Sequence, residues 1–127
     1  MIPAPHQGRL RLGAALAALA VATGAFGAHG LKTLVDASAL VTWETACRYH
    51  FFHALGILIT AFLPASNARI ASRFFLAGII LFSGSLYLLT FRDLVELPGI
   101  LGPITPIGGL CMIIGWLALI KKSSSTT

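Results

Sequence analysis

Hydrophobic positions along this chain fall into four long runs that short polar stretches separate. The runs predict four membrane-spanning helices, at about residues 10–28, 39–63, 74–91 and 103–120. Each approaches or exceeds the roughly 20 apolar residues that a helix needs to cross a membrane. We therefore expect an all-α membrane protein, a transmembrane four-helix bundle that forms one domain over residues 1–127.

The first run follows two arginines, so a cleaved signal peptide is the alternative for it. Small residues recur in this run at spacings of three and four, which lets one helix backbone approach another in lipid. A signal peptide has no need of such a face, and we therefore predict a retained helix. The residues expected at helix contacts are Gly13, Ala17, Ala20, Gly24 and Ala28 in this run, and Gly56, Gly84, Gly108 and Gly109 in the later runs.

Polar residues and glycines mark the ends of these helices. Gly30 is the expected C-cap of the first helix, and Asp36 or Ser38 the N-cap of the second. The stretch 64–73 contains a proline and two arginines, and we predict a turn there. The third helix then begins at residue 74.

Prolines make the start of the fourth helix irregular. Thr105 before Pro106 resembles an N-cap followed by a first helical residue, which predicts a regular helix only from about Pro106. The stretch 99–105 is then expected to enter the membrane as an irregular segment that other parts of the protein cover. A helix that begins near Pro98 and kinks at a proline is the alternative.

The composition agrees with a membrane protein, because 57% of the residues are hydrophobic and only 10% are charged. The formal net charge is +5, but the basic residues cluster, so we expect no nucleic acid partner. Four spans place one group of basic residues on a side that has no acids: Arg9, Arg11, Arg69, Arg73, Lys121 and Lys122. The positive-inside rule then predicts that both termini are cytoplasmic, in a bacterial inner membrane.

Ionisable side chains are concentrated in the second predicted helix. Such groups are costly in hydrocarbon and normally face a bundle interior or a wet cavity, so they mark a candidate functional site. The predicted topology brings further polar groups to the same depth, near the non-cytoplasmic surface. This candidate polar layer comprises His29, Glu44, Arg48, Tyr49, His50, His53, Tyr87 and Thr105.

Two groups within this layer have alternative interpretations. Glu44 and Arg48 have the spacing of an intrahelical ion pair, or Arg48 binds a lipid phosphate or a partner's carboxylate. His29, His50 and His53 provide possible ligands for a metal or a haem iron. Alternatively, each imidazole forms hydrogen bonds to neighbouring phenol, hydroxyl or carbonyl groups. His50 and His53 lie three positions apart on one helix and therefore cannot be the two axial ligands of a single haem.

No metal-hydrolase, nucleophile–base, P-loop or dinucleotide-binding pattern is present in the sequence. We therefore expect neither catalysis nor a cofactor. Cys47 and Cys111 lie in apolar surroundings and are expected to be unpaired, with a disulfide between them as the alternative. Four spans without an internal repeat also give little support to a permease.

Several short motifs resemble a known family. They are GAFGAHG at 24–30, Trp43, Tyr49-His50, HALG at 53–56, LFSGSLY at 81–87 and TPIGG at 105–109. In this order they resemble the DUF423 (UPF0382) family, small inner-membrane proteins of unknown function that include bacterial YgdD and eukaryotic transmembrane protein 256. The resemblance implies a four-helix integral membrane protein and implies no activity.

These observations favour a non-enzymatic membrane protein that binds a partner. The expected partners are membrane lipid, a larger membrane protein complex that it serves as an accessory or assembly component, or further copies of itself. The alternative function is haem or metal binding through His29, His50 and His53.

Overall fold

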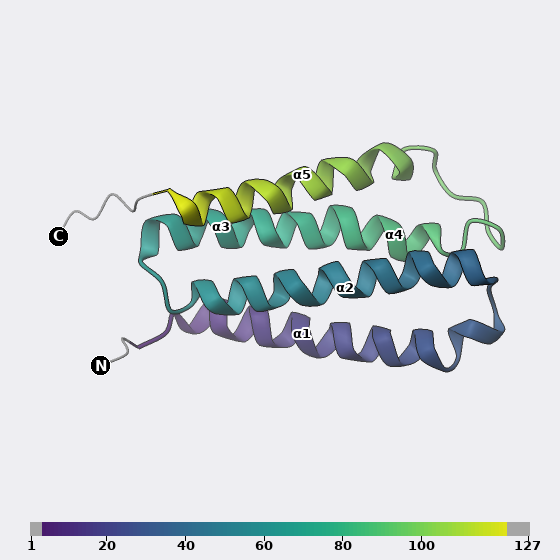
Figure 1. Ribbon diagram of the computed structural model, residues 1–127, viewed down its shortest axis with the longest axis horizontal. Helices are drawn as coiled ribbons and strands as arrows, with labels where there is room; N and C mark the ends of the chain where they lie inside the picture. Colours follow the sequence, from purple (N-terminus) through teal and green to yellow (C-terminus); the bar gives the residue numbers. More distant parts are fainter. Residues whose placement is uncertain (1–3, 122–127) are drawn as a thin grey trace.

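Four long helical segments run antiparallel, and each packs against the next along the chain (Figure 1). The computed structural model describes residues 4–121. The segments are α1 (Gln7–Ala28), α2 (Ala37–Thr60), a continuous third segment of α3 (Ala65–Gly78), η2 (Ile79–Ser83) and α4 (Gly84–Leu89), and α5 (Leu101–Ile120). The beginning of α1 and the end of α5 lie at the same end of the molecule (Figure 1). The expected all-α class is confirmed, and the described residues contain no strand.

Length and composition suit three of these stretches to a membrane crossing. Within residues 4–121 they are Gln7–Thr33, Ser66–Leu89 and Leu101–Ile120. Helix α2 has 24 residues but carries the ionisable side chains noted above. It nevertheless lies between α1 and α3 along their length (Figure 1).

The ends of α1 and α2 follow local capping. Helix α1 begins three residues before the expected position because the His6 side chain accepts a hydrogen bond of 3.2 Å from the Arg9 amide. Gly30 has a φ of −68°, so it is not a left-handed C-cap, and the short 3₁₀ helix η1 (Leu31–Thr33) follows. Asp36 caps α2 as expected, and its carboxylate accepts a 2.8 Å bond from the Ala39 amide.

The turn expected over 64–73 is wrong, because α3 begins at Ala65. Ala68, Ala71, Ser72 and Phe75 recur at helical spacing and are buried. The two arginines of this stretch are exposed on the opposite face, which made the sequence look polar throughout. The helix then contains a π-helical turn at η2, and α4 ends at Leu89 rather than at residue 91.

The irregular start expected for the fourth helix is also wrong, since α5 is helical from Leu101. Pro103 is its third residue, where a backbone N–H would have no intrahelical acceptor and its loss costs little. Pro106 lies inside the helix and removes one hydrogen bond, to the carbonyl of Gly102. The proline-interrupted helix, the alternative interpretation, therefore describes α5 better.

Close helix contacts form at some of the expected small residues. A Cβ added to Gly13 would lie 2.7 Å from the Leu58 backbone nitrogen, and one added to Gly108 would lie 2.2 Å from that of Phe82. Gly56 packs against the Phe75 ring, and Ala20 is buried. The core beside these contacts contains Ile57, Ala71, Phe75, Ile79 and Met112.

Other expected contact residues do not pack closely. Ala17 is only half-buried and Ala28 is exposed, while a Cβ at Gly24 would meet nothing within 4 Å. Gly84 meets only a carbonyl of its own helix segment, and Gly109 is in ordinary contact with Phe82. The buried residues of α1 are Gly13, Ala20 and Gly27, at a spacing of seven, so the contact follows a 3.5-residue period. Gly27, Gly78 and Gly115 form tight contacts that were not expected.

Candidate functional site

A buried chain of polar groups connects α1, α2 and α4. The Tyr87 hydroxyl lies 2.8 Å from Nδ1 of His50 and 3.0 Å from the Thr23 hydroxyl. Thr23 is in turn 3.4 Å from the Cys47 sulfur, and its carbonyl accepts a 2.8 Å bond from Nε1 of Trp43. The Trp43 ring also packs at 4.6 Å from the Tyr87 ring. Hydrogen bonds of partly buried groups thus fix three helices to one another.

His50 is 2% exposed and lies at the end of this series of hydrogen-bonded groups. Its Nδ1 bonds to Tyr87, whereas its Nε2 lies close to the backbone of Leu16 without forming a regular hydrogen bond. The ring is therefore enclosed by protein on all sides.

His53 lies one turn further along α2 and has a different set of contacts. Nε1 of Trp116 donates a 2.9 Å hydrogen bond to Nε2 of His53. Because an indole can only donate, Nδ1 of His53 carries the proton and donates to the Tyr49 carbonyl at 2.7 Å. Both imidazole nitrogens are occupied, so this histidine fastens α5 to α2 and has no nitrogen free for a ligand.

An open groove of about 740 Å³ lies between α2 and α5. Its walls are mainly apolar and aromatic, and they include Tyr49, Phe52 and His53 of α2, Phe82 of η2, and Gly109 and Trp116 of α5. The Tyr49 side chain is 39% exposed and stacks on His53, and its hydroxyl has no protein partner among the described residues. The groove therefore combines a wide apolar surface with one accessible hydroxyl.

The π-helical turn η2 forms the floor of this groove through Phe82. The backbone of α5 approaches it closely at Gly108, as described above. Ser83 in the same turn is fully buried, and its hydroxyl has no hydrogen-bond partner in the part of the chain that the structure describes. π-Helical turns occur frequently at functional sites. The π-helical turn, a feature that is frequent at functional sites, therefore lies at the groove.

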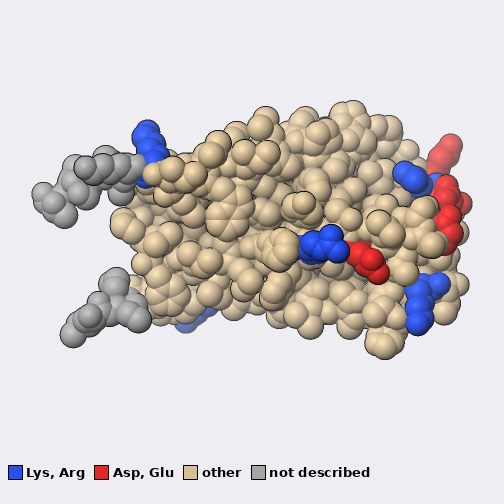
Figure 2. Space-filling view, in the orientation of Figure 1, with Lys and Arg blue, Asp and Glu red and all other residues tan. Residues whose placement is uncertain are grey.

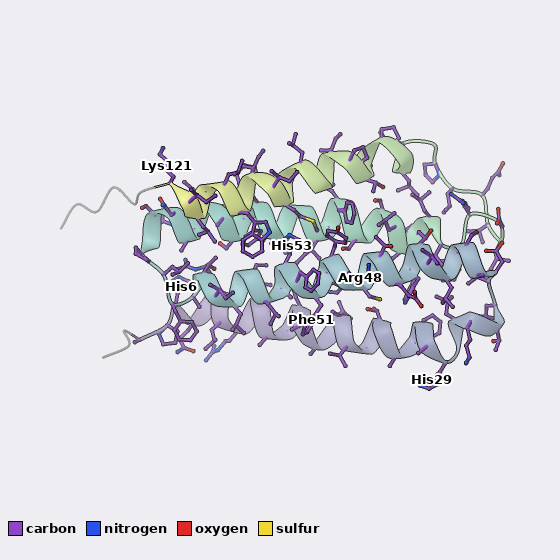
Figure 3. All side chains as sticks on the ribbon, viewed as in Figure 1. His6, His29, Arg48, Phe51, His53 and Lys121 are labelled. Carbon is purple, nitrogen blue, oxygen red and sulfur yellow. The ribbon has the colours of Figure 1, made fainter. Side chains whose placement is uncertain are left out.

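Glu44 and Arg48 lie on the exposed side of α2, outside both of these sites. Figure 2 shows one acidic and one basic side chain next to each other in the middle of an otherwise uncharged surface, and Figure 3 places Arg48 there. Between these two side chains the structure forms no close ion pair. The other charged groups visible in Figure 2 lie at the two ends of the molecule.

The expected common polar layer is not formed. His29 is exposed at the end of α1, far along the molecule from His53 (Figure 3). Thr105 bonds to the Ser85 hydroxyl and to the Leu101 carbonyl. Two pairs of these residues meet directly: His50 with Tyr87, and Tyr49 with His53 at the groove.

The histidine ligand set is therefore not assembled. No group of three His, Cys, Asp or Glu side chains within residues 4–121 is placed to hold a metal. His29 reaches neither His50 nor His53, because it lies at the far end of a different helix (Figure 3). Cys47 and Cys111 are free thiols, so the alternative of a disulfide is wrong.

Among the residues of these sites that were not predicted, Thr23, Phe82 and Trp116 make the most important contacts. Thr23 is the only hydroxyl residue in the first hydrophobic run, and that isolation is a signal that the sequence offers. Phe82 and Trp116 look like ordinary lipid-facing aromatic residues. Their role depends on the π-helical turn and on the bond to His53, neither of which has a sequence signal.

Comparisons with known proteins point to one family. The family model described as "Protein of unknown function (DUF423)" matches residues 23–109. The UPF0382 membrane protein YwdK of Bacillus subtilis is 45% identical over 114 residues, which cover 86% of this chain and 89% of the relative. A UPF0382 membrane protein of Staphylococcus aureus is 46% identical, covering 86% and 88%. A UPF0382 membrane protein of Schizosaccharomyces pombe is 40% identical over 80% of this chain and 89% of the relative. No solved structure shows significant similarity.

Proposed function

The chain belongs to the DUF423 (UPF0382) family of membrane proteins, and we propose that it is a non-catalytic accessory protein that holds a membrane lipid in the groove between α2 and α5. The observation that carries this proposal is the groove itself. Its volume of about 740 Å³ is within the range of about 300–1,000 Å³ that is typical of small-molecule sites.

The proposal includes four membrane spans, with both termini in the cytoplasm of a bacterial cell. Helix α2 packs antiparallel between α1 and α3, so it crosses wherever they cross. Arg9, Arg11 and Lys121 lie at the end where α1 begins and α5 ends, whereas Asp36 and Glu96 lie in connections at the other end. The positive-inside rule supports a cytoplasmic location for the basic end.

An acyl chain fits the shape and chemistry of the groove. Its α5 wall extends from Pro106 to Trp116, which is about 15 Å of helix and about half of a hydrocarbon core. Apolar walls suit a hydrocarbon chain, and the single accessible hydroxyl of Tyr49 suits one polar group on a lipid. A membrane lipid of one leaflet therefore satisfies both features.

The accessory role follows from what the groove lacks. His53 has both nitrogens occupied, so no general base faces the lipid. Such a groove would retain or position a lipid for a larger membrane complex without transforming it. A haem or metal function would need His29 beside His50 or His53, and we do not propose it.

The test compares the lipid that the native chain and a groove-filling variant retain. Gly109 lines the groove, and the side chain introduced by Gly109→Leu would project into it. Leu117→Phe adds bulk at a position that is 56% exposed and lies outside the groove. After extraction in a mild detergent, native mass spectrometry is expected to show one retained lipid for the native chain and for Leu117→Phe, and loss of most of that lipid for Gly109→Leu.

Circular dichroism of Gly109→Leu provides the folding control. Equal lipid retention by a folded Gly109→Leu variant would contradict the proposal. So would a native chain that retains no lipid.

A further inference from the structure

The exposed side of α2 carries charges where the surrounding surface is apolar. We define the outer face of α2 by Val41, Glu44, Arg48, Leu55 and Ile59, which recur at helical spacing and are all exposed. Buried residues of α2, such as Ala46 and His50, lie on the opposite side of the helix and pack against other segments. The outer face is therefore the part of α2 that no other helix of the chain covers.

Arg48 is near the centre of this face. It lies 11 residues from the beginning of α2 and 12 from its end, or roughly 17 Å from each. A hydrocarbon core of about 30 Å centred on the bundle leaves this guanidinium deep within it. Ionisable groups at such depth almost always pair with one another or face protein. Here both Arg48 and Glu44 are exposed, and neither forms a close ion pair with any residue that the structure describes.

We propose that the partner is a second copy of this chain, whose own outer face of α2 packs on the first around a two-fold axis along the membrane normal. Glu44 of each subunit then pairs with Arg48 of the partner subunit. In a two-fold interface the same surface must complement itself, and one acid with one base meets that condition. Two reciprocal pairs leave all four charges neutralised.

The direction of the side chains favours this diagonal pairing. Side chains on a helix tilt toward its N-terminus, so Arg48 leans toward the level of Glu44, one turn away. In a parallel pair of α2 helices, each guanidinium then reaches the carboxylate of the facing helix. A lipid phosphate is a poorer partner for Arg48, because it belongs at the membrane surface and would leave Glu44 unpaired.

The dimer is independent of the lipid groove. The lipid proposal depends on the aromatic and apolar residues that line the groove beside α5. The dimer proposal depends on the charges of the outer face. A dimer without a bound lipid, or a lipid-binding monomer, would therefore separate the two proposals.

Charge exchange tests the proposal. Glu44→Arg gives two bases on the face and Arg48→Glu gives two acids, so each variant is expected to lose self-association. Coexpressed with different affinity tags, the two variants are expected to copurify, because opposite charges face each other again. The double variant Glu44→Arg/Arg48→Glu is also expected to associate with itself. A different partner protein, whose charges stay fixed, would give neither rescue, and that result would overturn the proposal.

Cysteine cross-linking tests the geometry in native membranes. Val41→Cys, in a chain with both native cysteines replaced by alanine, is expected to form a disulfide-linked dimer on mild oxidation. Leu117 on α5 is about as exposed as Val41, at 56% against 60%, and Leu117→Cys is expected to remain monomeric. No dimer from Val41→Cys, or an equal yield from the α5 control, would overturn the two-fold arrangement.

Discussion

Helix α1 packs on α2, and α5 packs on α3 and η2, and in both pairs a glycine brings two backbones together. The contact at Gly13 in the first pair therefore resembles the contact at Gly108 in the second. Around these glycines the two pairs differ. In the first pair a hydrogen bond from Trp43 to Thr23 joins α2 to α1 directly, and Tyr87 of α4 connects Thr23 with His50. The second pair is fastened mainly by apolar and aromatic side chains.

This difference explains where a ligand can enter. Buried hydrogen bonds have strict geometry, and leaving any of their groups unpaired is costly, so the first pair tolerates little change of position. Apolar contacts have no such directional requirement. The groove lies beside α5, whose contact with α3 and η2 is mainly apolar, and at the groove the hydrogen bond from Trp116 to His53 joins α5 to α2. The predictions below disturb each pair in turn.

The largest expected effect is at Gly108 in the second pair. The added methyl group of Gly108→Ala would lie 2.2 Å from the Phe82 backbone nitrogen, and backbone cannot move aside as a flexible side chain can. We expect a loss of about 3 kcal/mol in the free energy of unfolding. Gly109→Ala is the matched control, since its methyl would meet Phe82 only at 3.5 Å. In thermal unfolding in mild detergent, Gly108→Ala should melt below the native chain and Gly109→Ala slightly above it, because alanine favours a helix over glycine where it fits.

A comparable but smaller effect is expected at Gly13 in the first pair. Gly13→Ala would place a methyl group 2.7 Å from the Leu58 backbone nitrogen. We expect a destabilisation of about 2 kcal/mol. Gly24→Ala on the same helix meets nothing within 4 Å and should be neutral or slightly stabilising. Equal melting temperatures for both variants would show that α1 does not approach α2 as described.

Removal of the Tyr87 hydroxyl tests the polar fastening of the first pair alone. Tyr87→Phe would leave Nδ1 of the buried His50 without its hydrogen-bond partner and would remove one contact of the Thr23 hydroxyl, which keeps its bond to the Ala20 carbonyl. We expect a loss of about 1–2 kcal/mol. Tyr49→Phe removes a hydroxyl that has no protein partner within residues 4–121 and should change the stability by less than about 0.5 kcal/mol. Chemical or thermal unfolding of the two variants measures the contrast.

The smallest expected effect is at Asp36, which caps α2 outside the spans. The Ala39 amide, with help from the Ser38 hydroxyl, holds the pKa of the Asp36 carboxyl below its ordinary value of 3.8. Its ionised form therefore stabilises the fold above that value, and this contribution is lost as the pH falls through the lowered pKa. Asp36→Asn can still cap the helix and should remove this acid dependence with little loss at neutral pH. Asp36→Ala should lower the melting temperature at neutral pH, by less than any variant above except the controls.

Much of the helical framework could be predicted from the sequence, because hydrophobic runs and the Asp36 cap are local signals. The sites are less accessible. His50 and His53 lie on similar sides of one helix, yet one meets α4 and the other meets α5. Which helix faces which residue depends on tertiary packing, and no spacing along the chain encodes it. Gly24 was predicted at a helix contact that Gly27 makes instead, because an alanine-rich helix offers several faces of small residues.

The π-helical turn at Ile79–Ser83 also sets the rotational phase of all that follows in the same helix. If the same five residues wound as a regular α-helix instead, each would advance by about 100° rather than by the smaller angle of a π-turn, and α4 would rotate by roughly a quarter of a turn relative to α3. Tyr87 would then point away from Thr23 and His50, although no residue that touches them had changed. Within this helix, the winding of the backbone between Phe75 and Tyr87 is therefore as much a determinant of the polar connection as the residues that form it.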